Sequence, residues 1–224
     1  MYERLPNVAT LPSEPRLPVE GDLASRERSG IEEAACAQTV EALTRALELR
    51  DYRRGSFAET KAHCDRVTHL GLRLTERVAP ELAIEPSLAH GFRLHDIGMI
   101  GVSDTILRKR GALTPSERDE IYEHPLLGER IVAPISALAG VARDVVGGHH
   151  ERWDGTGYPR RIGGDSIPLV ARIFSIVDAF ESLTHDQPYR DAFLQPVAIR
   201  EIERQSGLQF DPELVRIFTE LVAP

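Results

Sequence analysis

Two adjacent histidines, His149 and His150, stand just before a segment rich in glycine, aspartate and proline. Neighbouring residues on a helix point about 100° apart, so two adjacent imidazoles reach one small target most easily where a helix ends. Gly155, Gly157 and Pro159 then predict a fixed turn. We interpret residues 147–159 as a ligand-bearing helix end followed by a shaped loop. A surface turn with two solvated histidines is the alternative.

Further histidines and acids lie in apolar sequence with helical spacing. Glu59 and His63 are four residues apart, which places them on one helix face. Asp96 and Asp178 are embedded in apolar segments, where an unpaired carboxylate is unfavourable and needs a cation or several donors. The alternatives are that Glu59 only caps its helix, that His63 is an ordinary core histidine, and that His95 and Asp96 share a plain hydrogen bond. The candidate ligands are Glu59, His63, His95, Asp96, His124, His149, His150 and Asp178.

This set of imidazoles and carboxylates, without a matching set of thiols, suits Fe or Mn, with Zn or Ni as alternatives. Eight ligands exceed the needs of one ion. We therefore expect two or three divalent ions, with a carboxylate such as Asp96 between them. His69, His90 and His185 lack this context and are interpreted as ordinary residues, and Cys64 as a packing residue.

Helices must position these residues, because apolar side chains recur at spacings of three and four. Capping patterns predict helix starts at Ser56, Thr114 and Asp211, and Pro86 suits a first helical turn. Gly98 is expected to end the helix that reaches His95. The predicted helices are 31–51, 56–79, 86–96, 114–124, one beginning near 126, 135–147, 167–183, 191–205 and 212–222. No strand alternation and no repeat is evident, so the fold class is all-α.

Composition sets the broad class of protein. The chain has 224 residues, 42% of them hydrophobic, and a formal net charge of -8, which argues against a general nucleic-acid surface. It contains no apolar run of membrane-spanning length and no signal peptide pattern. Two cysteines favour a reduced, cytoplasmic setting. The proline-containing residues 1–30 are expected to be a flexible tail or linker, and residues 31–224 the folded domain.

Several motifs together resemble the HD-GYP family, a bacterial branch of the HD-domain phosphohydrolases. The resemblance covers roughly residues 31–224. Its main motifs are His95-Asp96-Ile97-Gly98, His149-His150-Glu151 and Gly157-Tyr158-Pro159. Further matches are Ile167-Pro168, Ala171-Arg172-Ile173, Leu183-Thr184, Pro188-Tyr189-Arg190 and Phe210-Asp211-Pro212.

The resemblance implies an all-helical HD domain with an irregular GYP loop. It implies hydrolysis of cyclic di-GMP to the linear dinucleotide pGpG or onward to GMP, by a hydroxide that bridges the metal ions. The candidate ligands named above match the metal ligands of the family, with Glu59 and His63 as the additional ones that accompany a third metal. His95 and Asp96 are then the catalytic pair, and Tyr158 lies near the mouth of the site.

Two positions depart from the family pattern. Met99 stands where the family has lysine, and Gln187 where it usually has arginine. In the family, the lysine and the arginine at these positions resemble phosphate-binding groups. The substrate site is therefore expected to be altered around Met99, Gln187, Tyr158 and Arg190. The candidate substitutes for the missing positive charges are Arg152, Arg160 and Arg161. The departures keep two alternatives open: a weakened signalling module whose GYP loop meets a partner protein, and a phosphohydrolase for another nucleotide.

Overall fold

The structure is a computed structural model that describes residues 20–52, 57–109, 111–186 and 190–223. The side chains of residues 20–29, 32, 33, 51, 52 and 57–60 lie outside the description. The chain divides into two compact units, Met1–Ala35 and Cys36–Pro224. The candidate ligands all belong to the second unit, which is the subject of the following sections.

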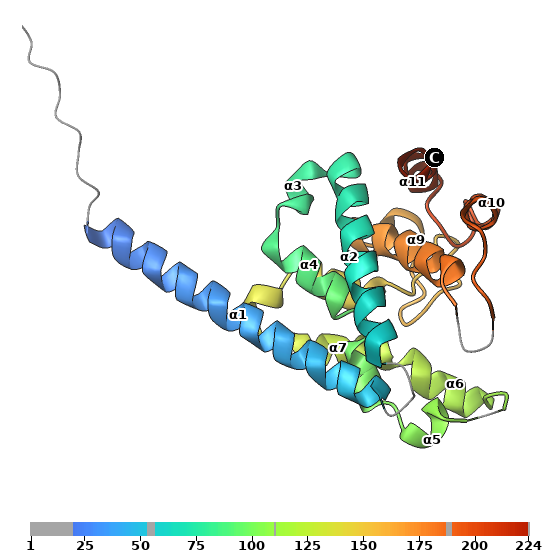
Figure 1. Ribbon diagram of the computed structural model, residues 1–224, viewed down its shortest axis with the longest axis horizontal. Helices are drawn as coiled ribbons and strands as arrows, with labels where there is room; N and C mark the ends of the chain where they lie inside the picture. The colour runs from blue at the N-terminus through green and yellow to red at the C-terminus, as the bar shows by residue number, and fades with distance from the viewer. Residues whose placement is uncertain (1–19, 53–56, 110, 187–189, 224) are drawn as a thin grey trace, which may run out of the picture. The chain divides into compact units, whose positions relative to one another are not determined.

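Regular secondary structure in the described residues is helical, which confirms the all-α prediction; no strand is assigned there (Figure 1). The α-helices are α1 (Glu20–Tyr52), α2 (Phe57–Val78), α3 (Pro80–Ala83), α4 (Pro86–Arg93), α5 (Asp104–Leu107), α6 (Pro115–Tyr122), α7 (His124–Val132), α8 (Val141–Gly148), α9 (Leu169–Thr184), α10 (Gln195–Arg204) and α11 (Pro212–Val222). The 3-10 helices are η1 (Ile97–Gly101), η2 (Ser136–Leu138) and η3 (Gly164–Ser166).

Local capping signals set several of these helix starts. The Thr114 hydroxyl accepts from the amide of Glu117, whose carboxylate accepts from the Thr114 amide, so the predicted capping box is confirmed. Asp211 caps α11 by accepting from the amide of Glu213. Pro86 occupies the first turn of α4, as predicted. The cap predicted at Ser56 lies outside the described residues.

Some predicted boundaries were wrong. Helix α1 begins at Glu20 rather than residue 31, because residues 20–30 are mostly polar and carry no apolar periodicity that would reveal a helix. Helix α4 ends at Arg93, so Gly98 does not cap it and lies instead within η1. The helix expected over 135–147 is broken at Gly140, which adopts a φ of 72°, into η2 and α8.

Two apolar clusters hold the second unit together, and the candidate ligands lie on the elements that join them. Side chains from α2, α4, α9, α10 and α11 form the larger cluster, around Phe92, Phe174 and Phe218. The second cluster joins the later part of α1 to α4, η1, α7 and α8, around Leu94 and Val146. In Figure 1, α9 crosses α2, and the two helices pack against each other. Among the described residues no helix is long and apolar enough to cross a membrane.

Candidate metal centre and active site

Seven of the eight candidate ligands are described, and they fall into two adjacent groups of potential metal donors. Each group has its donor atoms within 4.8 Å of one another. The groups combine α2, the turn between α4 and η1, the start of α7, the end of α8, and α9. The first group is Asp96, His124, His149 and His150, and the second is His63, His95 and Asp178. The side chain of Glu59 lies outside the described residues.

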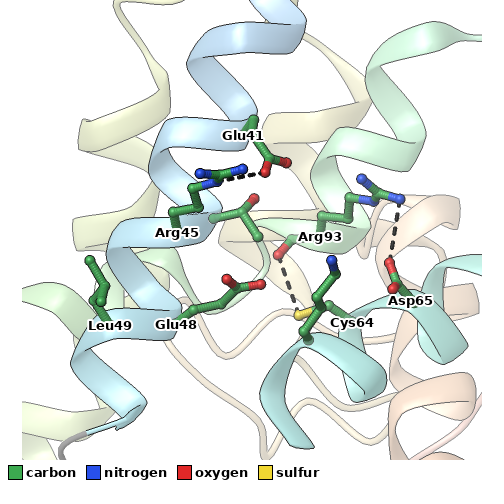
Figure 2. A pocket seen from close by; sticks show the side chains of 9 residues that line it. Glu41, Arg45, Glu48, Leu49, Cys64, Asp65 and Arg93 are labelled. Carbon is green, nitrogen blue, oxygen red and sulfur yellow. Dashed lines mark hydrogen bonds and ion pairs between the residues drawn. The ribbon is translucent and has the colours of Figure 1, made fainter. Parts of the chain in front are cut away.

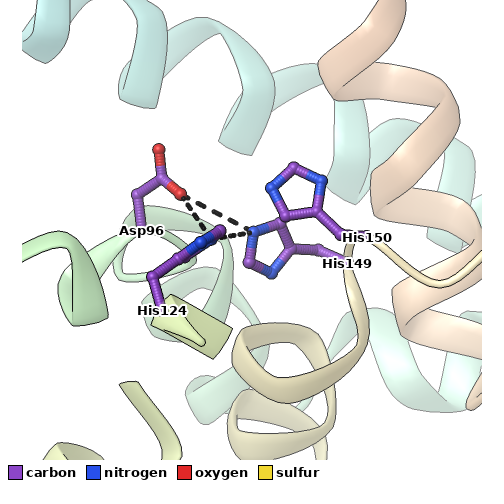
Figure 3. Close-up of side chains that lie close together, drawn as sticks. All are labelled: Asp96, His124, His149 and His150. Carbon is purple, nitrogen blue, oxygen red and sulfur yellow. Dashed lines mark hydrogen bonds and ion pairs between the residues drawn. The ribbon is translucent and has the colours of Figure 1, made fainter. Parts of the chain in front are cut away.

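Asp96 faces the histidines of the first group with one carboxylate oxygen (Figure 3). Its Oδ1 atom lies 3.2 Å from Nε2 of His124 and 3.6 Å from Nε2 of His149. The ring of His150 packs beside both imidazoles, with its centroid 4.2 Å from that of His149 and 5.0 Å from that of His124. Three imidazoles and one carboxylate thus converge on one point.

The other oxygen of Asp96 faces the second group. Its Oδ2 atom lies 3.5 Å from Nε2 of His95. Beyond His95, Nε2 of His63 lies 3.3 Å from Oδ1 of Asp178, so helices α2 and α9 contribute one donor each. Asp96 therefore stands between the two groups, in the position of a carboxylate that bridges two cations.

Backbone carbonyls fix which ring nitrogen faces the centre. The Nδ1 atom of His95 lies 2.9 Å from the Phe92 oxygen, and Nδ1 of His124 lies 2.7 Å from the Ile121 oxygen. His149 makes the same contact with the Val146 oxygen at 3.0 Å. A carbonyl oxygen can only accept, so each Nδ1 atom carries a proton, and each Nε2 atom points into the cluster, where the neutral ring presents a lone pair. Metal-binding histidines use this arrangement, and the residues fit a metal centre.

Charges in the cluster suit a cation. Desolvation opposes ionisation of Asp96, but the charge of His95 and the close contacts with His124 and His149 hold its pKa well below the usual range. Burial alone would lower the pKa of His95, and the carboxylate of Asp96 raises it to about 9. Burial lowers the pKa of His149. Burial, together with the neighbouring His149, holds the pKa of His150 well below its usual value. The lowered pKa values keep His149 and His150 in the neutral form that binds metal, whereas His95 would lose its proton on binding an ion.

Helix α9 supplies the apolar wall of the cluster as well as a candidate ligand. Phe174 is fully buried, and its ring centroid lies 4.7 Å from that of His95 and 6.1 Å from that of His149. Asp178 follows four residues later on the same helix face. An aromatic residue and an acid four positions apart, and therefore on one helix face, were a signal available in the sequence. Phe174 excludes water from one side of the imidazoles.

Glu151 organises the loop that follows the two histidines, a role that the sequence analysis missed. Its side chain is buried, and its two carboxylate oxygens accept from the amides of Arg160 at 2.6 Å and Ile162 at 3.2 Å. Gly157 lies inside this loop, where an added Cβ atom would approach the Arg152 amide to 2.4 Å and the His150 oxygen to 2.6 Å. An acid inside a glycine- and proline-rich segment is the signal that could have predicted such a carboxylate anchor.

Tyr158 packs against the first donor group. Its ring stacks on His150 at a centroid distance of 4.7 Å and on Tyr122 at 4.0 Å. A cavity of about 370 Å³ opens beside these rings. Its walls include His149, His150, Tyr122, Tyr158, Arg161 and Asp178. The cavity therefore reaches ligands of both groups, and Tyr122 is a wall residue that the sequence analysis did not identify.

The structure places two of the predicted substrate-binding residues in packing roles. Met99 is half-buried against the second apolar cluster. The guanidinium of Arg190 donates to the carbonyls of Ser182 and Leu183, near the end of α9, and to that of Asp191, and it lies 4.4 Å from the Phe193 ring. Gln187 lies outside the described residues. Substrate binding by these three residues stays a prediction.

A second pocket, of about 340 Å³, lies among α1, α2 and α4 (Figure 2). Two of its acids are paired with arginine: Glu41 with Arg45 at 2.8 Å, and Asp65 with Arg93 at 3.4 Å. Its wall also includes the buried Glu48 and Cys64. None of the potential metal-donor groups found among the described residues includes these side chains, so the donors for chemistry lie in the other cavity.

Comparisons with known proteins agree with this geometry. Residues 23–214 match the family model of the HD domain. The chain is 35% identical over 185 residues to a cyclic di-GMP phosphodiesterase of Thermotoga maritima, covering 82% of this chain and 49% of that relative. It is 33% identical over 181 residues to 3'3'-cGAMP-specific phosphodiesterase 2 of Vibrio cholerae, covering 80% of this chain and 33% of the relative.

A solved structure shows the same fold. An HDG"Y"P protein from Bdellovibrio bacteriovorus superposes with a TM-score of 0.56 at 17% identity, covering 72% of this chain and 52% of that one. The chain spans just under half the length of curated relatives such as the Thermotoga maritima protein. The family-model match covers most of the chain. The chain therefore belongs to the HD domain family of metal-dependent hydrolases, in its HD-GYP branch.

Proposed function

We propose that this chain is a metal-dependent phosphodiesterase that hydrolyses cyclic di-GMP to pGpG, to GMP, or to both. The observation that carries the proposal is the position of Asp96, whose two oxygens face two groups of imidazole and carboxylate donors beside an open cavity. Its relatives at 33–38% identity include proteins named as cyclic di-GMP phosphodiesterases.

The proposed ligands follow from the two groups. His124, His149 and His150 would hold one divalent ion with Asp96, and His63, His95 and Asp178 would hold a second beside the other oxygen of Asp96. Glu59, four residues before His63, would extend the site with it toward a third ion. We propose Fe or Mn, because nitrogen and oxygen donors without thiolates suit these ions, with Zn or Ni as alternatives. Ions in this position supply activation of water near neutral pH and neutralisation of charge on the phosphate oxygens.

The chain's own residues provide orientation and an apolar wall. Hydrogen bonds from Nδ1 to backbone carbonyls hold His95, His124 and His149 in one tautomer. Phe174 shields the imidazoles from water on one side, so electrostatic interactions with the substrate phosphate act in a medium of lowered dielectric. Tyr158 presents its ring beside His150, where it borders the space that a nucleotide would occupy. His95 and Asp96 are catalytic in this proposal because they hold the ions that contact the reacting phosphate.

A second candidate substrate is 3'3'-cGAMP, which carries the same two phosphodiester groups. The observation in its favour is that relatives at 33–38% identity include 3'3'-cGAMP-specific phosphodiesterases of Vibrio cholerae. A weakened signalling module, with the GYP loop facing a partner protein, remains the alternative without turnover. The inward stacking of Tyr158 on His150 favours the catalytic function over a partner surface.

The test compares both cyclic dinucleotides with one preparation. Purified protein is loaded under anaerobic conditions with Fe(II) or Mn(II), and products are separated by chromatography. Release of pGpG or GMP from cyclic di-GMP supports the proposal, and release from 3'3'-cGAMP alone supports the second candidate. Absence of product with Fe, Mn, Zn and Ni in turn would favour the signalling module. We further propose residues 31–224 as the functional domain and a cytoplasmic setting, which the free Cys36 and Cys64 support.

A further inference from the structure

Arg161 combines an unusual backbone with a free side chain at the wall of the cavity. Its φ is 56°, which makes it the only non-glycine residue with positive φ among the described residues. This left-handed conformation costs an L-residue about 1–2 kcal/mol relative to the ordinary helical region. Such strain persists where the surroundings fix it, and it concentrates at functional sites.

The buried carboxylate of Glu151 fixes this conformation. The amides on either side of Arg161, those of Arg160 and Ile162, both donate to Glu151. The chain must therefore turn tightly at the residue between them. Glycine would meet that demand without strain, and this sequence has arginine instead.

The side chain of Arg161 is exposed and lines the cavity beside His149, His150 and Asp178. The neighbouring cations are already engaged, since Arg152 pairs with Asp154 at 3.0 Å and Arg160 with Glu129. No ion pair or hydrogen bond of the Arg161 guanidinium occurs within the described part of the chain. Of these three arginines, Arg161 is the one whose charge is available to a ligand.

We propose that Arg161 binds the second, non-reacting phosphodiester of the cyclic dinucleotide. This inference rests on the proposed function. A cyclic dinucleotide carries two phosphodiester groups, and only one at a time can lie at the ligand cluster. The other needs a cation farther along the cavity, and a planar guanidinium holds two phosphate oxygens at once. Arg161 thereby takes the place of the cations missing at Met99 and Gln187.

Arg161→Gly tests the proposal sharply, because the substitution removes the cation and suits the backbone. The melting temperature should be equal to or higher than that of the wild type. The KM for cyclic di-GMP should rise about tenfold, since a charge-assisted contact is lost, while kcat stays within about twofold. Bis(p-nitrophenyl) phosphate has a single phosphodiester, so its KM should not change. Arg161→Lys, which keeps the charge but not the planar fork, should be intermediate.

An unchanged KM for cyclic di-GMP in Arg161→Gly would overturn the inference, as would an equal rise for both substrates, which indicates general damage to the loop. A calorimetric titration of metal-free protein with cyclic di-GMP separates this result from failure of the proposed function. If the wild type turns over neither substrate, the proposed function fails, and a Kd about tenfold weaker in Arg161→Gly still supports phosphate binding. Equal Kd values, or no binding by the wild type, overturn the inference.

Discussion

The Nε2 atoms of His124 and His149 lie 3.2 Å apart, while the Nδ1 atom of each ring is bonded to a backbone carbonyl. Both Nε2 atoms therefore present lone pairs to each other, and these repel unless a proton or a metal ion lies between them. Asp96 adds negative charge at 3.2 Å from one of them and 3.6 Å from the other. A cation at this point would stabilise the arrangement, so we expect metal binding to stabilise the fold.

Removal of metal should therefore lower the melting temperature. A ligand present at 1,000 times its Kd stabilises the folded state by about 4 kcal/mol. For a chain of this size we expect a chelator to lower the melting temperature by roughly 8–16 °C. Differential scanning calorimetry, with and without chelator followed by re-addition of Mn(II), measures this shift.

Two histidine variants supply the matched comparison. His124→Ala should remove most of the chelator response, because it deletes a ligand. His69→Ala should keep the full response, because His69 is an exposed histidine of α2 that belongs to neither donor group. Equal responses in both variants would contradict metal binding at this cluster.

Two substitutions of Tyr158 should distinguish the contribution of its ring from that of its hydroxyl. The ring stacks on both His150 and Tyr122, so Tyr158→Ala should raise the KM for cyclic di-GMP and lower the melting temperature by a few degrees. Tyr158→Phe keeps the stacking and should retain the melting temperature. Steady-state kinetics with both variants measures the difference. Identical kinetics in Tyr158→Ala and the wild type would show that the ring does not border the bound substrate.

Gly98→Ala should damage the site through the backbone. An added Cβ atom would lie 1.8 Å from the carbonyl oxygen of His124, so η1 and α7 would have to move apart. We expect a loss of stability of about 1–3 kcal/mol or more and a large loss of kcat, because His124 begins α7. Gly111→Ala, where an added Cβ atom meets nothing within 4 Å, is the control. Urea unfolding of both variants measures the loss, and similar midpoints would refute the close-packing argument.

Glu48 should be a source of instability rather than of function. The residue is 6% exposed and lines the second pocket, and its carboxylate makes no ion pair or hydrogen bond in the described part of the chain. Glu48→Leu should therefore raise the free energy of unfolding by roughly 1–3 kcal/mol. The exposed and ion-paired Glu41 is the control, and Glu41→Leu should change stability little. A destabilised Glu48→Leu variant would show that this carboxylate has a ligand or partner.

The features that could be predicted from the sequence are those with local signals. The capping box of Thr114 and Glu117 depends on four consecutive residues, and helix α9 on one apolar run. The candidate ligands could be proposed from the sequence because an acid inside apolar sequence, such as Asp178, needs a partner. Other features depend on distant contacts. The burial of Glu48 results from packing of α1, and the left-handed backbone of Arg161 results from two bonds to Glu151. Short elements such as α5 carry too few residues for any periodicity.

The most direct test measures metal content and products on one preparation of the wild type and of Asp96→Asn, with both folded proteins checked by circular dichroism. We predict about two or three Fe or Mn ions per wild-type chain and release of pGpG or GMP from cyclic di-GMP. Asp96→Asn should retain fewer ions and release no product, because one oxygen of the carboxylate faces each donor group. An unchanged metal content together with wild-type turnover in Asp96→Asn would contradict the shared centre.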